Sequence, residues 1–443
     1  MLESAIDDAL GSALVASLSS GPTTAAQLQR LTGKSQPTVS RALHALGARV
    51  VALGAGKATR YGLARQIRGA AGQQPLWWTS ASGELTRWGT LSFLAPDTVH
   101  VAAPGIDSLV HGELPWFLSP LQPQGYLGRE WGRRLGLERD PAQWSLEEIL
   151  HAALRIEDAP GAISIGEPMG EFVPEVPVNL QSRARHYDGL AADVASRGRA
   201  GSSAGGEQAK FLTGLASGER VLVKFTPPRG TPFGERWHDL LHAEALALQV
   251  LGEHGVSVAS ARIVESPQRT YLESTRFDRM PPSGLGRRHV VTLDAVHRAF
   301  VHGARENWAA TCDALALQRR LDPLDARAAR ALLTFGRLIG NTDMHFGNLS
   351  LWADDPAQAR FALAPLCDML PMRWRPDGFH GMQDCAPFEV PPPGADGATP
   401  RAGAPAESPR TVAQTYWRRA AMHAAFSPEF RAVAAEMARR LSA

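Results

Sequence analysis

Cysteine is scarce in this sequence, and its few cysteines are widely separated. The 443 residues contain three of them, Cys312, Cys367 and Cys385, and no two form a Cys-x-x-Cys pair. Disulfide frameworks and cysteine-based zinc sites need numerous or closely paired cysteines. We therefore expect neither kind of site, and we expect a reducing compartment.

Long apolar runs and an early basic segment are missing too. No apolar stretch approaches the ~18 residues that a membrane-spanning helix needs. The chain begins with Glu3, Asp7 and Asp8 and has no Lys or Arg near them, whereas a signal peptide starts with basic residues. We expect a cytoplasmic, non-membrane protein, and its length suggests two to four domains at ~100–200 residues each.

Lysine is the rarest charged residue. Of the 46 Lys and Arg residues only four are lysines, namely Lys34, Lys57, Lys210 and Lys224. This scarcity is typical of a coding bias towards Arg, but a position that keeps Lys can require its compact ammonium group. Residues 1–72 hold eight Lys and Arg against three Asp and Glu, while the remainder is slightly acidic. A basic N-terminus on a near-neutral body is typical of a nucleic-acid-binding module.

Residues 1–72 also have the pattern of a winged helix-turn-helix domain. Thr23 and Ser35 are the expected N-caps of the second and third helices, and Thr32-Gly33 forms the turn between them. The expected elements are helices over residues 2–18, 23–31 and 35–46 and strands over residues 50–53 and 60–63. In such a domain the third helix enters the DNA major groove and the strand hairpin contacts the backbone.

The candidate DNA contacts lie before and on the third helix and on the hairpin. They are Lys34, Thr38, Ser40, Arg41, His44, Lys57 and Arg60. The alternative is a three-helix packing module with ordinary surface charges, because such modules are also reused for protein contacts.

A second set of residues indicates a nucleotide site. Residues 198–206 are rich in Gly, Ser and Ala, so their backbone N–H groups could approach phosphates, although such a run can also be a linker. Lys224 lies inside the apolar strand 221–225 and needs an anion. Glu244, on the apolar face of the following helix, supplies one. Kinases use a Lys–Glu pair of this kind to hold phosphates, and a purely structural ion pair is the alternative.

The stretch 331–368 carries the most specific pattern. An apolar helix ends near Gly340, and Asp343 and Asn348 follow at the Asp-x₄-Asn spacing of the kinase catalytic loop. A strand hairpin over residues 349–363 comes next, and Asp368 stands after it. Phosphoryl transfer needs a carboxylate that accepts the hydroxyl proton, and an amide and a second carboxylate that hold Mg²⁺.

These motifs together resemble the HipA family of bacterial Ser/Thr kinases, over about residues 80–390. The matching segments are Ser203-Ala204-Gly205-Gly206-Glu207-Gln208-Ala209-Lys210, Lys224, Arg276-Phe277-Asp278-Arg279, Thr342-Asp343-Met344-His345-Phe346-Gly347-Asn348 and Leu363-Ala364-Pro365-Leu366-Cys367-Asp368. The fused winged helix resembles the YjjJ-type branch of that family. The sequence departs from the family pattern at Met344, where many members have Gly, and at Gly347, where many have Lys.

The resemblance implies a role for each matching residue. Asp343 would be the catalytic base, and Asn348 and Asp368 would be the Mg²⁺ ligands. Ser203, or Ser202 if the loop is aligned differently, would be the autophosphorylation site. The residues implied to bind ATP are Ser203, Ala204, Gly205, Gly206, Lys224, Glu244, Thr275, Phe277, His345 and Cys367.

The resemblance also implies an α+β fold in which a bilobal kinase-like body follows the winged helix. Residues 73–275 would form a β-rich N-lobe with a HipA-like N-terminal subdomain. Residues 276–443 would form a mostly helical C-lobe, with 391–410 as a flexible Pro/Gly/Ala-rich segment. The expected activity is transfer of the ATP γ-phosphoryl group to Ser or Thr, both on a protein and on the chain's own loop.

The expected partners follow from this activity. They are ATP, double-stranded DNA for autoregulation with the chain as a homodimer, and a protein substrate such as an aminoacyl-tRNA synthetase or another translation factor. The alternative function is a DNA-binding transcriptional regulator whose kinase fold only senses nucleotide. A kinase of small molecules is a third interpretation.

One pattern suggests a metal and is set aside. His238 and His242 stand four residues apart on a predicted helix, as in a zinc-binding His-Glu-x-x-His helix. The Glu of that motif is absent and no third ligand is evident, so we interpret the pair as part of a solvent-facing helix surface.

Overall fold

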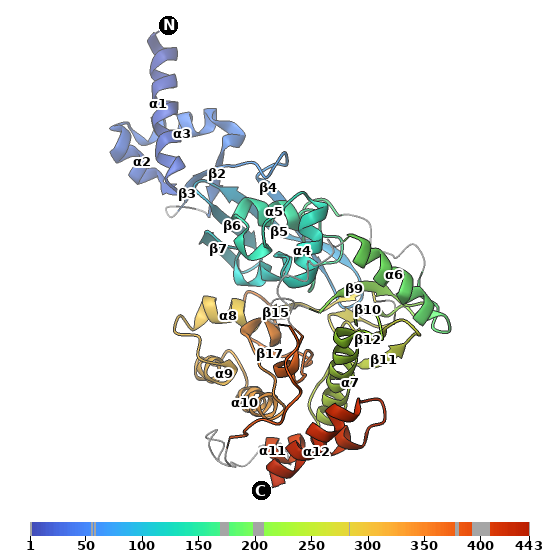
Figure 1. The fold of residues 1–443 in the computed structure, drawn as a ribbon. Helices are drawn as coiled ribbons and strands as arrows, with labels where there is room; N and C mark the ends of the chain where they lie inside the picture. The colour runs from blue at the N-terminus through green and yellow to red at the C-terminus, as the bar shows by residue number, and fades with distance from the viewer. Residues whose placement is uncertain are drawn as a thin grey trace.

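A computed structural model describes most of the chain. The described residues are 2–54, 56, 59–168, 177–197, 208–282, 284–376, 381–391 and 408–442, without the side chains of 2–8 and 197. The predicted loop residues Ser202, Ser203, Ala204, Gly205 and Gly206, the hairpin residue Lys57 and most of the segment 391–410 lie outside this set. The fold is mixed α+β, as expected, with the N-terminal helices at one end and helices α11 and α12 at the other (Figure 1).

The N-terminal unit, defined as residues 2–63, contains the elements expected from the sequence. These are α1 (Leu2–Ser19), β1 (Thr23–Thr24), α2 (Ala25–Thr32), α3 (Gln36–Ala45), β2 (Val50–Leu53) and β3 (Arg60–Leu63). The strands pair in the order β1-β3-β2, and Leu14, Leu28 and Val39 pack at the centre. The cap of α2 is Thr24 and not Thr23, because the Thr24 hydroxyl accepts the Gln27 N–H; both threonines pair with β3 before α2 begins at Ala25.

A five-stranded antiparallel sheet follows the N-terminal unit. Its strands are β4 (Gln73–Thr79), β5 (Leu85–Leu94), β6 (Thr98–Ala103), β7 (Ile106–His111) and β8 (Ile163–Ile165), in the order β7-β6-β5-β4-β8. Helices α4 (Gly125–Arg134) and α5 (Leu146–Ala153) lie between β7 and β8 in the chain. Their apolar side chains share one core with the sheet, and Leu91, Phe93 and Leu150 are fully buried in it.

A second antiparallel sheet carries Lys224. Its strands are β9 (Lys210–Gly214), β10 (Arg220–Phe225), β11 (Ala261–Glu265) and β12 (Thr270–Thr275), in the order β11-β12-β10-β9. Helix α6 (Arg183–Arg197) packs on it through Tyr187. Helix α7 (Pro232–Glu253) runs from this sheet towards α11 and α12 (Figure 1).

The C-terminal part is mostly helical. Its elements are β15 (Val290–Thr292), α8 (Leu293–Phe300), α9 (Trp308–Leu317), α10 (Pro323–Leu338), β16 (Ser350–Trp352), β17 (Ala362–Leu363), α11 (Pro409–Met422) and α12 (Pro428–Ser442). The apolar side of α7 belongs to the same core as α8 to α12, with Leu251, Trp417 and Phe430 buried in it. Helix α7 therefore joins the β-rich part of the molecule to the helical part.

Helix α7 is covered on more sides than the sequence suggests. His238 is 6% exposed and His242 is 9% exposed, so the expectation of a solvent-facing surface at these residues was wrong. The reason is tertiary: Thr270 of β12 and Ala425 of the α11–α12 connection both contact His238. Helical periodicity identifies one apolar stripe, but it does not show that polar faces are covered as well.

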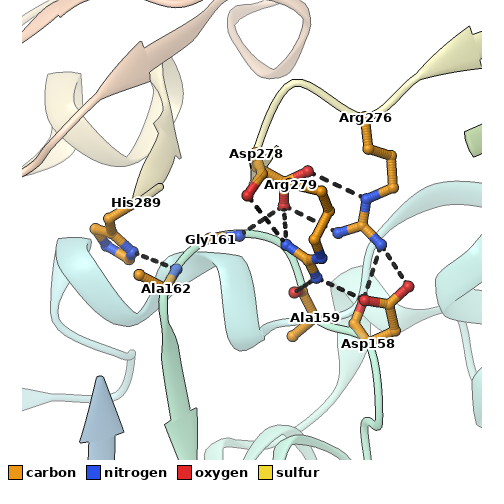
Figure 2. A network of polar contacts seen from close by, with 8 residues as sticks. All are labelled: Asp158, Ala159, Gly161, Ala162, Arg276, Asp278, Arg279 and His289. Atoms are coloured by element: carbon orange, nitrogen blue, oxygen red, sulfur yellow. Dashed lines mark hydrogen bonds and ion pairs between the residues drawn. The ribbon is translucent and has the colours of Figure 1, made fainter. Parts of the chain in front are cut away.

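A buried ion-pair network joins the five-stranded sheet to the rest of the molecule (Figure 2). The guanidinium of Arg276 donates to both oxygens of Asp278, and Arg279 donates to Asp278 Oδ2 at 2.6 Å. Both arginines also pair with Asp158, which precedes β8. The Gly161 N–H donates to Asp278 Oδ2 at 2.9 Å. Three buried charged side chains and the partly buried Asp158 thus hold the segment after β12 against the segment before β8.

Replacing Asp278 with Asn should destabilise the protein in a pH-dependent way. Burial opposes ionisation of Asp278, but Arg276 and Arg279 outweigh it and hold the pKa of this carboxyl below its usual range. A depressed folded-state pKa adds stability above the unfolded value of ~3.9, and this stability disappears as the pH falls below it. Asp278→Asn should cost about 3–5 kcal/mol at pH 7, because it leaves two buried cations with one partner, and less at pH 3.

Urea denaturation at a series of pH values measures this difference. The matched control is Asp354→Asn, which removes a carboxylate from an exposed pair with Arg288 and should cost at most about 1 kcal/mol. Equal losses in the two variants would show that the buried network does not contribute as described.

Candidate active site

A buried ammonium group with two carboxylates forms the centre of the candidate site. Lys224 Nζ donates to Glu244 Oε1 at 2.6 Å and Oε2 at 2.7 Å, and it also donates to Asp368 Oδ1. The Asp368 N–H donates to Glu244 Oε1 at 3.2 Å. Three residues from β10, α7 and the segment after β17 meet here, and the sequence predicted all three as site residues.

Strand geometry explains why Lys224 faces this cluster. Val221, Val223 and Phe225 point to the side of β10 that packs on α6, and Lys224 points to the opposite side, because side chains alternate along a strand. Helix α7 places Glu244 against that side, and Thr231 caps the start of α7 by accepting the Gly234 N–H. Lys224 is 5% exposed and Glu244 is 1% exposed, so the pair is almost completely desolvated.

The charges of the cluster shift the pKa values of its members. Burial alone would lower the pKa of Lys224, but the carboxylates of Asp368 and Glu244 outweigh burial and raise it above its usual range. Burial, with Asp368 nearby, raises the pKa of Glu244 despite its contact with Lys224. Burial also tends to raise the pKa of Asp368, but Lys224 and Lys210 outweigh it and hold the pKa of this carboxyl down to about 2. The two carboxylates therefore interact with two ammonium groups, those of Lys224 and Lys210.

The backbone of Asp368 is unusual. Its φ of 57° lies in the left-handed region, which is uncommon for residues other than glycine. Such conformations cost free energy and concentrate at functional sites, where surrounding contacts hold them in place. Asp368 is held by Lys224 and Glu244, and its side chain remains 32% exposed.

Asn341 links Asp368 to the predicted catalytic loop. It is 6% exposed; its Nδ2 donates to the Asp368 carbonyl at 3.4 Å, and its Oδ1 accepts the Asp343 N–H at 3.0 Å. The Asn348 Nδ2 donates to the Asp343 carbonyl at 2.7 Å. Sequence reasoning gave Asn341 no role. The one signal available in the sequence was its position directly after Gly340. The structure shows this glycine with a φ of 78°.

His345 lies beside the predicted base. Its Nε2 is 3.9 Å from Asp343 Oδ1, both side chains are partly exposed, and the Trp308 indole N–H donates to the His345 carbonyl at 3.0 Å. Cys367 precedes Asp368 in the chain, and burial raises the pKa of its thiol, followed by the effect of the Asp368 charge. The Cys367 side chain is therefore an uncharged neighbour of the acidic cluster at pH 7.

The two predicted adenine contacts lie further along the chain. Thr275 ends β12, where it pairs with Val221 of β10. Phe277 packs edge-on against Trp352 of β16, with ring centroids 5.4 Å apart. These contacts place them on the connection between the β9–β12 sheet and the β15–β17 sheet, and not in contact with Lys224.

The donor atoms fit a hard divalent cation such as Mg²⁺. Asp368 offers a carboxylate, and Asn348 offers an amide oxygen because its Nδ2 is used by the Asp343 carbonyl. Carboxylate and amide oxygens are the ligands that Mg²⁺ prefers.

The predicted DNA-contact residues form a separate region on the N-terminal unit. Lys34, Arg41, His44 and Arg60 are exposed, and Thr38 and Ser40 are half-buried. The Ser35 hydroxyl lies 3.0 Å from the Thr38 hydroxyl, and it makes no capping bond to the α3 backbone. From residue 9 to residue 83 the sequence contains eight Lys and Arg and no Asp or Glu.

Comparisons with known proteins agree with this layout. Residues 70–172 match the family described as "YjjJ-like toxin, middle domain", and residues 202–442 match "HipA-like C-terminal domain". The fold resembles HipA of Shewanella oneidensis MR-1, which was solved in complex with HipB and operator DNA. The TM-score is 0.52 with 19% identity, over 83% of this chain and 95% of that one.

One curated relative matches almost end to end. The toxin YjjJ of Escherichia coli (strain K12) is 34% identical over 438 residues, which is 95% of each chain. The chain therefore belongs to the HipA family, and within it to the YjjJ-like toxins. Among the described residues, no helix has the length and apolarity that crossing a membrane requires.

Replacing Asn341 with Ala should loosen the loop that carries Asp343. The substitution leaves the Asp343 N–H and the Asp368 carbonyl without their side-chain partner, which should cost about 1–3 kcal/mol. Hydrogen exchange should become faster at residues 341–348 and around Asp368. Gln358→Ala, which removes an exposed hydrogen bond to Asp355, is the control and should leave exchange there unchanged. Unchanged exchange in Asn341→Ala would contradict the linking role.

Proposed function

We propose that the protein is a Ser/Thr protein kinase that transfers the γ-phosphoryl group of ATP. The observation that carries this proposal is the meeting of Lys224, Glu244 and Asp368 beside the loop of Asp343 and Asn348. Phosphoryl transfer requires little covalent chemistry from a protein, but it requires positioned charges and a proton acceptor. This cluster contains both.

Each residue has a role that follows from its position. Lys224, held by Glu244, would place its ammonium group against the ATP phosphates as a point charge. Asp343 is 42% exposed and would accept the proton of the attacking hydroxyl. Asn341 would keep Asp343 and Asp368 in register.

Asn348 and Asp368 would hold Mg²⁺. When bound, Mg²⁺ neutralises charge on the phosphates and favours their in-line displacement. The chain's own contribution is the oxygen pair and the left-handed backbone that presents Asp368.

The substrate and biological role follow from the family resemblance. The phosphorylated target would be a protein, such as an aminoacyl-tRNA synthetase or another translation factor. A second target would be the chain's own loop at Ser203 or Ser202, a modification that can switch a segment between ordered and disordered states. The curated relative is named a toxin, and we extend that growth-limiting role to this chain.

We also propose that the N-terminal unit is a winged helix that binds double-stranded DNA. Its exposed cations and the absence of Asp and Glu between residues 9 and 83 support this role, because phosphate contacts supply much of the affinity for DNA. The structurally similar HipA was solved with a separate HipB and operator DNA. Here α3, with Arg41 and His44, would contact DNA directly, with the chain as a dimer that regulates its own synthesis.

A second candidate function is a regulator that senses nucleotide without transferring phosphate. The observation that favours it is Gly347, which stands in the catalytic loop where related sequences often have Lys. A missing cation beside the transferred phosphate would slow the reaction while leaving the Lys224 site able to bind ATP.

Asp343→Asn should abolish phosphate transfer without unfolding the protein. The amide cannot accept the hydroxyl proton, yet it has nearly the same shape as the carboxyl. Intact-mass measurement after incubation with Mg-ATP should show added phosphate in the unsubstituted protein and none in the variant. Circular dichroism and Tm should be unchanged.

The control for this experiment is Asp355→Asn, in the nearby β16–β17 connection, where the carboxylate only accepts exposed hydrogen bonds. It should keep full phosphorylation. Phosphate gained by Asp343→Asn would refute the assigned base. A lack of phosphate on the unsubstituted protein with or without an added protein substrate, together with ATP binding, would favour the sensing regulator.

Arg41→Gln should weaken binding to a similar extent for different DNA sequences. Loss of one phosphate contact should lower the affinity several-fold and reduce the slope of log Kd against log salt by about 1. Fluorescence anisotropy with random double-stranded DNA at several salt concentrations measures both quantities. Arg439→Gln removes the same charge from α12 and should have no effect. Equal weakening in both variants would contradict a specific role for α3.

A further inference from the structure

Two histidines and a glutamate meet on the outer side of α7, away from Lys224. His238 and His242 lie one turn apart on α7, and Glu265 ends β11. One candidate ligand atom from each residue lies within 4.8 Å of the other two. His242 Nε2 is 3.3 Å from Glu265 Oε1, and His238 Nδ1 is 3.9 Å from the same oxygen. The cluster thus draws on two separate elements.

The ring of His238 is held in the orientation that a metal ligand needs. Its Nε2 lies 2.9 Å from the Ala425 carbonyl, which can only accept, so Nε2 carries the proton. The lone pair is therefore on Nδ1, which lies 3.9 Å from Glu265 Oε1 and accepts the Thr270 hydroxyl at 2.7 Å, a hydrogen bond that a metal ion on Nδ1 would replace. A backbone carbonyl that fixes the tautomer of a ligating histidine is the usual outer support of protein metal sites.

The cluster is both desolvated and accessible. His238 and His242 are both buried. A cavity of about 510 Å³ adjoins His242 and is also lined by His423 and Ser260. The Glu265 side chain is 47% exposed, which leaves room for water as a further ligand.

We propose that His238, His242 and Glu265 form a binding site for a divalent transition metal such as Zn²⁺. Two imidazole nitrogens and one carboxylate oxygen suit Zn²⁺ far better than Mg²⁺ or Ca²⁺, which prefer oxygen ligands only. Ligand atoms around one tetrahedral Zn²⁺ lie about 3.3 Å apart, so the side chains need to close by roughly 1–1.5 Å. On binding, the His242 proton now shared with Glu265 moves from Nε2 to Nδ1.

A bound ion would fasten α7 to the edge of the β9–β12 sheet, beside the α11–α12 connection that holds His238. Helix α7 also carries Glu244, but the metal site does not depend on any kinase activity. Zn²⁺ binding and phosphate transfer can therefore succeed or fail independently, and each has its own measurement.

The test uses the full-length, tag-free chain after treatment with a chelator. Zn²⁺ is titrated by competition with a chromophoric chelator. Excess Mg²⁺ is present to occupy the proposed site at Asn348 and Asp368. The expected result is one Zn²⁺ per chain, a Tm that rises with Zn²⁺ concentration, and a Kd weakened at least tenfold in both His242→Gln and Glu265→Gln. Glu265→Gln retains an acceptor for His242, so it should fold normally without metal.

The matched control is His111→Gln, which removes an exposed histidine from the end of β7 and should bind Zn²⁺ like the unsubstituted chain. Circular dichroism of the metal-free proteins verifies that every variant is folded. Binding of less than one Zn²⁺ per chain, or an unchanged Kd in folded Glu265→Gln, would overturn the proposal.

Discussion

The candidate site depends on one interaction, the contact of the Lys224 ammonium group with the carboxylates of Glu244 and Asp368. A fully buried ammonium group is tolerated only when anions compensate for its lost hydration. Three distant segments must therefore come together for the strand to fold with Lys224 inside. The same requirement brings Asp368, and through Asn341 the loop of Asp343, to the side of the sheet on which Lys224 lies.

Helix α7 connects the Lys224 cluster to the rest of the molecule. It carries Glu244 towards the sheet, shares the core of α8 to α12, and presents His238 and His242 to β11 and the α11–α12 connection. The buried network of Arg276, Asp278 and Arg279 fixes the neighbouring segment after β12 in a similar way. The Lys224 cluster and this network both contain charged groups that are costly to bury alone, so both favour the one arrangement of chain segments in which the charges are paired.

Much of the site was predictable because its chemistry is encoded in short spacings. The strand around Lys224 and the helix face of Glu244 were both predicted correctly from local pattern, and the Asp343–Asn348 spacing supplies the proposed catalytic loop. Errors occurred where a neighbouring element decides the outcome. Thr23 and Thr24 both pair with β3, so α2 begins only at Ala25 and Thr24 is its cap. His238 is buried because segments far away in the chain cover it.

The sequence by itself determined the α+β class and the family, and it supplied the residues to which we assign phosphoryl transfer in our proposal. Helical periodicity, strand periodicity and motif spacing are local properties, so they can be recognised without knowledge of the fold. Tertiary structure alone decided the bridging role of Asn341, the left-handed backbone of Asp368 and the meeting of His238 and His242 with Glu265. These depend on contacts between residues more than 20 positions apart, which packing sets and local sequence does not.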